Sequence, residues 1–247
     1  MRTIHRHHIM PGSATSGKLT ILKWFEQIPA KRTILDVGPG WATYSKLLRQ
    51  PGQVWHAIEI HKPYIERFSL TKYYDKIFVL DVCKFNPKIT YDVIILGDVI
   101  EHIRKNQSIS TLGRLFKKSQ WCIVSIPLDE ETHAPTDNCN EYWNNQHEEH
   151  VAAWSNKAFM QTISGLGGEI VAMEKYRELG IYLIATQTKK KYISEYAAKP
   201  IEWFLFHYTH WFENKEEGTI QRYKRKIRNR INKYSKSLTN RSTTQGH

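Results

Sequence analysis

Short apolar runs alternate with amphipathic stretches along most of the chain. The runs contain few polar residues, which is typical of strands that are buried on both faces. They cover residues 34–37, 54–59, 77–81, 91–98 and 121–126. Between them, apolar residues recur three and four positions apart, which predicts helices. These helices are expected at 13–28, 42–48, 63–70, 99–118 and 155–163. The alternation predicts an α/β fold with a parallel sheet covered on both faces, closed by an antiparallel pair at 169–173 and 181–186.

The pattern changes after residue 188. Residues 201–212 are dense in aromatic side chains, and a basic helix with an apolar stripe is predicted after Gly218. From Lys189 onward, 14 Lys and Arg residues stand against 5 Asp and Glu residues, so +9 of the net charge of +12 belongs to this segment. We therefore predict three parts. They are a domain at 1–188, an aromatic and basic helical extension at 189–238 and a disordered tail at 239–247.

Three roles fit this extension. It can pack on the domain as an additional helix with its basic face in solvent. It can also bind an anionic membrane surface peripherally through residues 201–238, because aromatic side chains beside a basic amphipathic helix favour such a surface. Nucleic acid is a weaker expectation, since the segment matches no recognised nucleic-acid-binding module.

Composition points to a cytoplasmic location. No apolar run approaches twenty residues, which argues against a membrane span. Residues 1–10 are basic and histidine-rich but precede no apolar segment, so they do not resemble a secretory signal. The cysteines, Cys83, Cys122 and Cys139, are odd in number and unclustered, which indicates reduced thiols.

A glycine turn follows the first apolar run. Gly38 and Gly40 let the backbone approach a bulky ligand between a strand and a helix, the usual wall of a nucleotide site. Each of the first four strands ends in a carboxylate. These acids are Asp36, Glu59, Asp81 and Asp98, and they are expected to face one crevice. Acids would repel a pyrophosphate, and Thr43 replaces the third glycine of the dinucleotide fingerprint. S-adenosylmethionine fits better, because it is cationic and carries a ribose diol.

At this point residues 18–188 resemble the class I S-adenosylmethionine-dependent methyltransferases, in the branch that acts on small molecules and glycans. The opening motif is Leu35-Asp36-Val37-Gly38-Pro39-Gly40, followed by Ala42 where a third small residue is usual. The resemblance implies a Rossmann-like, seven-stranded, mostly parallel sheet. It also implies that Glu59 holds the ribose hydroxyls, that Asp81 and Val82 read adenine, and that the segment from Gly97 through Asp98 to His102 lines the methionine end. The implied cofactor-binding residues are Asp36, Gly38, Gly40, Glu59, Asp81, Val82 and Asp98.

The acceptor is expected to be a small molecule or glycan methylated at oxygen, or at carbon. The Asn/Asp-Pro-Pro-Tyr/Phe motif that resembles the base-methylating branch is absent after the fourth strand. Candidate general bases are His102, His147 and His150. His102 can equally be a helix-start residue, and the segment 149–151 can simply cap the helix at Ser155. Two alternatives stay open, an RNA or protein methyltransferase recruited by the extension and a catalytically silent scaffold that binds the cofactor.

A metal ion is a further alternative in the loop before this helix. Its candidate ligands are His133, Asp137, Cys139, Glu141, His147 and His150. Their spacing matches no familiar ligand set, and loops rich in such residues are usually solvated. We therefore predict that no metal is bound by this loop.

Overall fold

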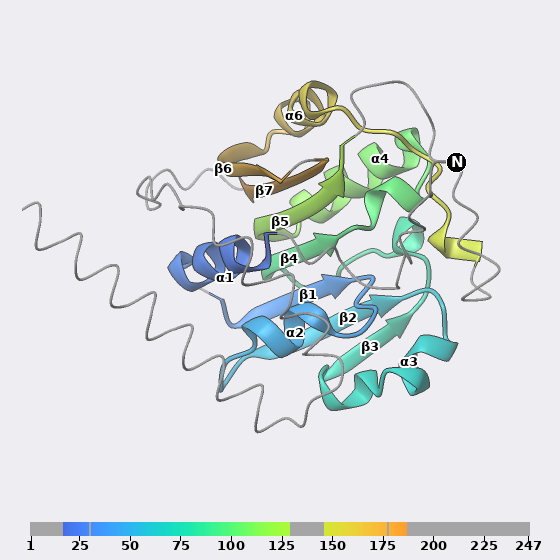
Figure 1. Ribbon diagram of the computed structural model, residues 1–247. Helices are drawn as coiled ribbons and strands as arrows, with labels where there is room; N and C mark the ends of the chain where they lie inside the picture. The colour runs from blue at the N-terminus through green and yellow to red at the C-terminus, as the bar shows by residue number, and fades with distance from the viewer. Residues whose placement is uncertain (1–16, 30, 129–145, 177, 187–247) are drawn as a thin grey trace, which may run out of the picture. The chain divides into compact units, whose positions relative to one another are not determined.

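A seven-stranded sheet organises the protein (Figure 1). The computed structural model describes residues 17–29, 31–128, 146–176 and 178–186. The strands are β1 (Thr33–Val37), β2 (Val54–Glu59), β3 (Lys76–Val79), β4 (Tyr91–Gly97), β5 (Ser119–Pro127), β6 (Glu169–Tyr176) and β7 (Leu179–Ala185). The helices are α1 (Lys18–Gln27), α2 (Thr43–Leu48), α3 (Pro63–Arg67), α4 (Lys105–Phe116) and α6 (Asn156–Gly165). Short 3-10 turns are η1 (Leu70–Lys72), η2 (Val82–Lys84), η3 (Ile100–His102) and η4 (Gln146–Glu148).

The strand order is β3-β2-β1-β4-β5-β7-β6. Strands β1 to β5 are parallel, and β7 pairs antiparallel with both β5 and β6. The order reverses between β1 and β4, and ligands of open α/β sheets bind beyond the carboxyl ends of the strands at such a point. The predicted mostly parallel, Rossmann-like sheet and its closing antiparallel pair are thereby confirmed.

Helices cover both faces of the sheet, as the alternating pattern predicts (Figure 1). On one face Phe25 of α1 contacts Trp55 of β2, with ring centroids 6.0 Å apart. On the other face a buried cluster joins Leu112 of α4 and Phe159 of α6 to Ile94 of β4. Both faces of the central strands are therefore buried, which explains their uninterrupted apolar sequence.

Three elements differ in extent from their predictions. The helix predicted at 63–70 stops at Arg67, because Ser69 takes a left-handed backbone with φ of 51°. The helix predicted at 99–118 is divided into η3 and α4, because the backbones of Ile103 and Arg104 are extended, with ψ of 135° and 136°. The Ser108 hydroxyl of α4 donates to the carbonyls of Ile100 and Ile103 across this break. Strand β3 ends before Asp81, which instead caps η2 by accepting a hydrogen bond from the Cys83 N–H at 2.8 Å.

Several predictions fall outside the described residues. These are the extension at 189–238, the tail at 239–247, and the loop residues His133, Asp137, Cys139 and Glu141. The domain boundary after residue 188 and the membrane and nucleic-acid roles therefore stay predictions. Within the described ranges, no helix is long and apolar enough to cross a bilayer.

Candidate active site

The glycine turn after β1 brings bare backbone against the segment that follows β4. Gly38, Gly40 and Ala42 all have left-handed backbones, with φ of 63°, 48° and 58°. A Cβ on Gly38 would lie 2.9 Å from Cγ2 of Val99, closer than carbon atoms pack. The turn therefore requires glycine at residue 38, and it lies where the strand order reverses.

Asp36 of β1 is fully buried beside this turn. Its Oδ2 accepts a hydrogen bond from the Tyr74 hydroxyl at 2.6 Å, whereas Oδ1 has no hydrogen-bond partner among the described residues. Burial raises the pKa of the Asp36 carboxyl to about 7, although the Tyr74 hydrogen bond and the Lys18 ammonium oppose the shift. An unsatisfied buried carboxylate oxygen fits a cationic or hydrogen-bond-donating ligand.

A chain of polar side chains connects α1 to the end of β4. The Lys18 ammonium donates to the Tyr44 hydroxyl at 2.7 Å, which lies 3.2 Å from the Ser125 hydroxyl. Ser125 in turn donates to Oδ1 of Asp98 at 3.1 Å. Burial lowers the pKa of Lys18 to about 8, and the carboxylates of Asp98 and Asp36 limit that shift. Lys18 therefore supplies positive charge to the acids at the ends of β1 and β4.

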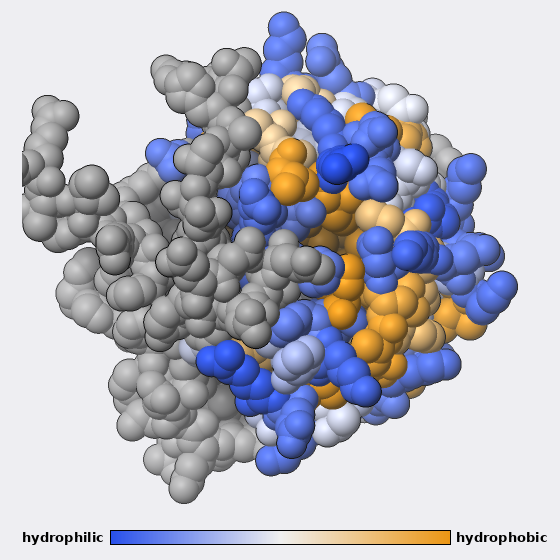
Figure 2. Space-filling view, turned by 90° about the vertical axis from the view of Figure 1, so that its right-hand side faces the viewer, coloured by the Kyte–Doolittle hydropathy of each residue, from blue (hydrophilic) through white to orange (hydrophobic). Residues whose placement is uncertain are grey.

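Glu59 is the last residue of β2 and is 4% exposed. Its Oε1 accepts a hydrogen bond from the His61 N–H at 2.7 Å. Burial raises the pKa of the Glu59 carboxyl to about 7; the His61 hydrogen bond opposes the shift, while Glu148 and Asp36 add to it. Figure 2 views the side toward which the parallel strands point, and apolar surface is exposed there among polar residues. Ile60 and Val79, at the ends of β2 and β3, are 40% and 49% exposed, which fits contact with a flat aromatic base.

Asp81 and Val82 lie at the end of β3 in the η2 turn. One carboxylate oxygen of Asp81 caps this turn, so the residue has a structural role in addition to the predicted contact with adenine. Arg114 of α4 fixes the same turn, because its guanidinium donates to the carbonyls of Val82, Cys83 and Phe85 at 3.0, 2.8 and 2.7 Å. The η2 turn is thereby held in place by a side chain of α4.

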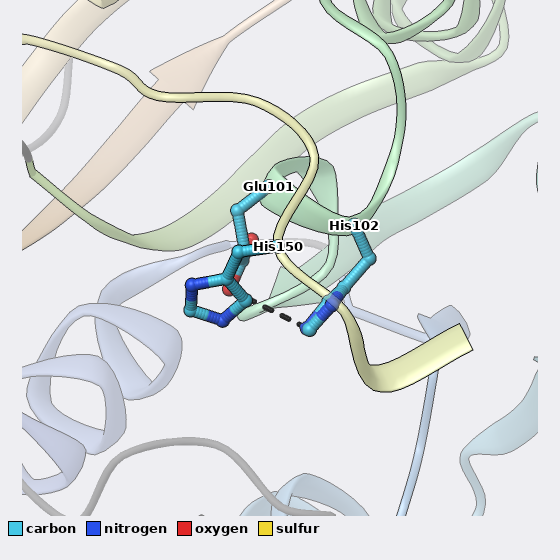
Figure 3. Close-up of side chains that lie close together, drawn as sticks. All are labelled: Glu101, His102 and His150. Atoms are coloured by element: carbon cyan, nitrogen blue, oxygen red, sulfur yellow. Dashed lines mark ion pairs between the residues drawn. The ribbon is translucent and has the colours of Figure 1, made fainter. Parts of the chain in front are cut away.

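Glu101, His102 and His150 come together beyond the end of β4 (Figure 3). Glu101 and His102 belong to η3, and His150 comes from the segment before α6. The two imidazole rings have centroids 4.8 Å apart, and Nε2 of His102 lies 3.9 Å from Oε1 of Glu101. Burial and the neighbouring His150 lower the pKa of His102 to about 4, so its ring is neutral at physiological pH.

The segment carrying His147 and His150 runs along this edge of the sheet. Oε1 of Glu148 accepts a hydrogen bond from the Tyr64 hydroxyl at 3.1 Å, and the charge of Glu148 raises the pKa values of both Glu59 and Glu101. His147 lies on the side of His61, whose pKa it lowers after the larger effect of burial. The structure thus brings together His102 and His150, whereas the described cluster around them does not include His147.

The segment 149–151 is not the cap of α6. The Ser155 hydroxyl takes that role by accepting a hydrogen bond from the Ala158 N–H at 3.2 Å. Instead, the N–H groups of Val151 and Ala152 both donate to the carbonyl of Glu101, at 2.8 and 3.0 Å. The segment is therefore held against η3 and carries His150 with it.

Charge at this edge is the feature that defines the site. Among the described residues, the charged side chains classed as buried are those of Lys18, Asp36, Glu59 and Glu101, three carboxyl groups against one amine. Such an edge suits a positively charged ligand with hydroxyl donors, and the glycine turn leaves room for it. The fold and this site define a class I S-adenosylmethionine-dependent methyltransferase, with S-adenosylmethionine as cofactor.

The sequence comparison gives the same result. The chain belongs to the methyltransferase-domain family, whose model matches residues 7–172. No curated protein matches the chain in sequence at a significant level.

Solved methyltransferases share the fold. The N-terminal domain of EvdMO1, solved with S-adenosylhomocysteine and D-fucose, is 13% identical with a TM-score of 0.52, covering 68% of this chain and 82% of that chain. An S-adenosylmethionine-dependent methyltransferase from Clostridium acetobutylicum is 12% identical with a TM-score of 0.53. The match covers 69% of this chain and 90% of that chain. Magnesium protoporphyrin IX methyltransferase from Synechocystis, with S-adenosylmethionine bound, is 13% identical with a TM-score of 0.51, covering 69% and 78%.

Four residues of the site were assigned no role from the sequence: Lys18, Tyr74, Glu101 and Arg114. Tyr74 and Arg114 act through long-range contacts that leave no local pattern. For Lys18 the sequence does contain a signal. This residue lies three, four and seven residues before Ile21, Leu22 and Phe25, on the buried face of α1, where a charged side chain is unusual. Glu101 appeared in the predicted motif but was assigned no role of its own.

Proposed function

We propose that the protein transfers a methyl group to a hydroxyl oxygen of a small molecule or glycan, and that Glu101, His102 and His150 mark the acceptor side. The observation that carries this proposal is the convergence of the buried Glu101 carboxyl group with the imidazoles of His102 and His150 beyond the end of β4. Methyl transfer to nitrogen needs no base when the amine is neutral, whereas transfer to an alcohol must also remove a proton.

The chemistry divides between cofactor and protein. The bound cofactor supplies a methyl group activated by its sulfonium, and the C–S bond breaks as the C–O bond forms. In this proposal Asp36, Glu59 and Asp98 hold the cofactor, and the Gly38 turn admits it. The hydroxyl proton leaves toward the acceptor-side cluster, and the segment at 147–152 limits access of water to the reacting atoms.

Some structural neighbours support an oxygen acceptor. EvdMO1 was solved with a sugar, D-fucose. The mitomycin 7-O-methyltransferase, with a TM-score of 0.51 and 17% identity, is named for an oxygen acceptor. These likenesses favour the proposal, and the acceptor itself has to be found by experiment.

The test is transfer of isotopically labelled methyl from S-adenosylmethionine into fractions of a cell extract. We expect label in low-molecular-weight or glycan fractions, in a bond that resists mild alkali as an ether does. The matched background is the Gly40→Val variant, because Gly40 has a left-handed backbone with φ of 48° that valine adopts only under strain. Label recovered in RNA, in protein or on nitrogen would overturn the proposal.

A further inference from the structure

The acceptor-side cluster has the composition of a metal site. Glu101, His102 and His150 each offer one ligand atom, and the three atoms lie within 4.8 Å of one another. Figure 3 shows the three side chains converging from η3 and from the segment before α6. Ligands bound to one cation at about 2.1 Å are separated by roughly 3 to 4 Å, so small side-chain rotations bring these atoms to coordinating distance.

Glu101 is the first reason to infer a cation. Its side chain is 2% exposed, and neither carboxylate oxygen has a hydrogen-bond partner among the described residues. A buried carboxylate whose oxygens have no hydrogen-bond partner is costly. A bound cation would give this buried carboxylate the partner that it lacks among the described residues.

His102 is oriented as metal ligands usually are. Its Nδ1 lies 3.1 Å from the carbonyl oxygen of Glu149. Because a carbonyl only accepts, Nδ1 carries the proton, and in the neutral ring Nε2 then has a free lone pair. This is the arrangement in which a second-shell carbonyl fixes the tautomer and direction of a coordinating imidazole. This lone pair is on the nitrogen that lies 3.9 Å from Oε1 of Glu101.

The backbone that follows His150 is held against η3. The N–H groups of Val151 and Ala152 hold the carbonyl of Glu101, so the residue before them cannot move independently of η3. Two sequence segments separated by 48 residues are thus locked together at the point where their ligand atoms meet. A site that is preorganised in this way loses little entropy when it binds an ion.

We propose that Glu101, His102 and His150 bind a divalent transition-metal cation such as Mn²⁺, Fe²⁺ or Zn²⁺. Two imidazoles and one carboxylate favour these ions over Mg²⁺ and Ca²⁺, which prefer oxygen ligands. Three protein ligands leave positions open for oxygen atoms of an acceptor. When the cation is bound, the ligand atoms no longer accept the hydroxyl proton, and a hydroxyl on the cation loses that proton to solvent. That second role rests on the proposed function, whereas the cation site itself rests on the geometry alone. The proposal replaces the loop ligands considered from sequence, retaining only His150.

The test is calorimetric titration of the chelator-treated, full-length protein with Mn²⁺, and in parallel with Mg²⁺. The N-terminal His5, His7 and His8 are potential competitors, so the background is a variant with alanine at these three positions. We expect one Mn²⁺ per chain in this background and weaker binding of Mg²⁺. Absence of stoichiometric Mn²⁺ binding in this background would overturn the proposal.

Two substitutions locate the site. Glu101→Gln and His150→Gln should each weaken Mn²⁺ binding more than about 100-fold, because even outer-shell partners are worth 10- to 100-fold. Glu66→Gln, an exposed acid on α3, should leave it unchanged. Binding of S-adenosylhomocysteine by the same variants shows that they are folded. Unchanged Mn²⁺ affinity in folded Glu101→Gln protein would refute the site. No acceptor is needed, so this outcome is independent of whether the proposed acceptor chemistry is correct.

Discussion

Cofactor binding should release protons, and Glu59 is the residue on which this prediction can be tested most directly. Its carboxyl group has a pKa of about 7, compared with 4.5 for the free side chain, chiefly because it is buried. That difference corresponds to about 3 kcal/mol in favour of the protonated form in the folded, cofactor-free protein. At pH 7 about half of the molecules therefore carry a proton on this group.

Ribose hydroxyls that donate to Glu59 would stabilise its ionised form and lower its pKa. Binding at pH 7 should then release about 0.5 proton from Glu59. Asp36, with a pKa of about 7 and a cationic ligand nearby, should release a similar amount. The expected total is about one proton per cofactor, and Glu59→Gln should reduce it by about half.

The sign of the pH dependence follows from the same values. Both carboxyls bind protons more tightly in the folded protein than in the unfolded chain, so the stability that they contribute is present at low pH. The free energy of unfolding of the cofactor-free protein should fall as the pH rises from about 4 to about 7. Glu59→Gln should make that fall shallower.

The assay is calorimetry of S-adenosylhomocysteine and S-adenosylmethionine binding in buffers that differ in ionisation enthalpy, since the slope of observed enthalpy against buffer enthalpy counts the protons released. Glu66→Gln, on the exposed side of α3, is the matched control and should release as many protons as the unmodified protein. Binding enthalpy that is independent of buffer at pH 7 would refute the reasoning. A slope unaltered by Glu59→Gln would show that other groups release the protons.

Three further predictions concern the scaffold. Gly38→Ala should lower the free energy of unfolding by about 1–2 kcal/mol in urea titrations and weaken cofactor binding, because φ is 63° and the new Cβ would lie 2.9 Å from Val99; Gly165→Ala, with open space around it, should do neither. Arg114→Met should reduce stability by about 1–3 kcal/mol and weaken cofactor binding by calorimetry, since the carbonyls of the η2 turn lose their donor. Ser155→Ala should lower the thermal midpoint through a loss of about 1 kcal/mol, with cofactor affinity unchanged, because only the cap of α6 is removed.

The sheet could be predicted because the burial of each strand is evident from the apolar residues of that strand alone. Residues 93–96 and 121–124 are apolar in succession because both of their faces are covered. An acid, Asp98, follows the first of these runs. The same locality explains why Gly38 could be predicted to lie in a turn and Glu59 at a strand end. Their positions follow from a turn and from a strand end, which a short window of sequence contains.

Contacts between distant segments could not be predicted in this way. Nothing in the sequence around Tyr74 indicates that its hydroxyl meets Asp36, which lies 38 residues earlier. The break before α4 lies at the extended residues Ile103 and Arg104, and the side-chain types at these two positions do not distinguish them from helical residues. The convergence of His150 on Glu101 depends on backbone hydrogen bonds to one carbonyl, and such bonds are independent of side-chain identity.

The distribution of buried charge explains why these acids occur together at all. In the described part of the chain, Lys18 is the buried amine and Asp36, Glu59 and Glu101 are the buried carboxyls, all at one end of the parallel strands. A fold selected for stability alone would not leave carboxyl oxygens of Asp36 and Glu101 without partners, because each such group costs free energy. The excess of buried carboxyl groups over buried amines is explained if the ligands bring the compensating positive charge. The cofactor would bring a sulfonium and an ammonium near Asp36, and the proposed metal cation would bind at Glu101. On this view the ligand-free protein is held in a state of excess buried acid, and its two sites are the places where that excess is neutralised.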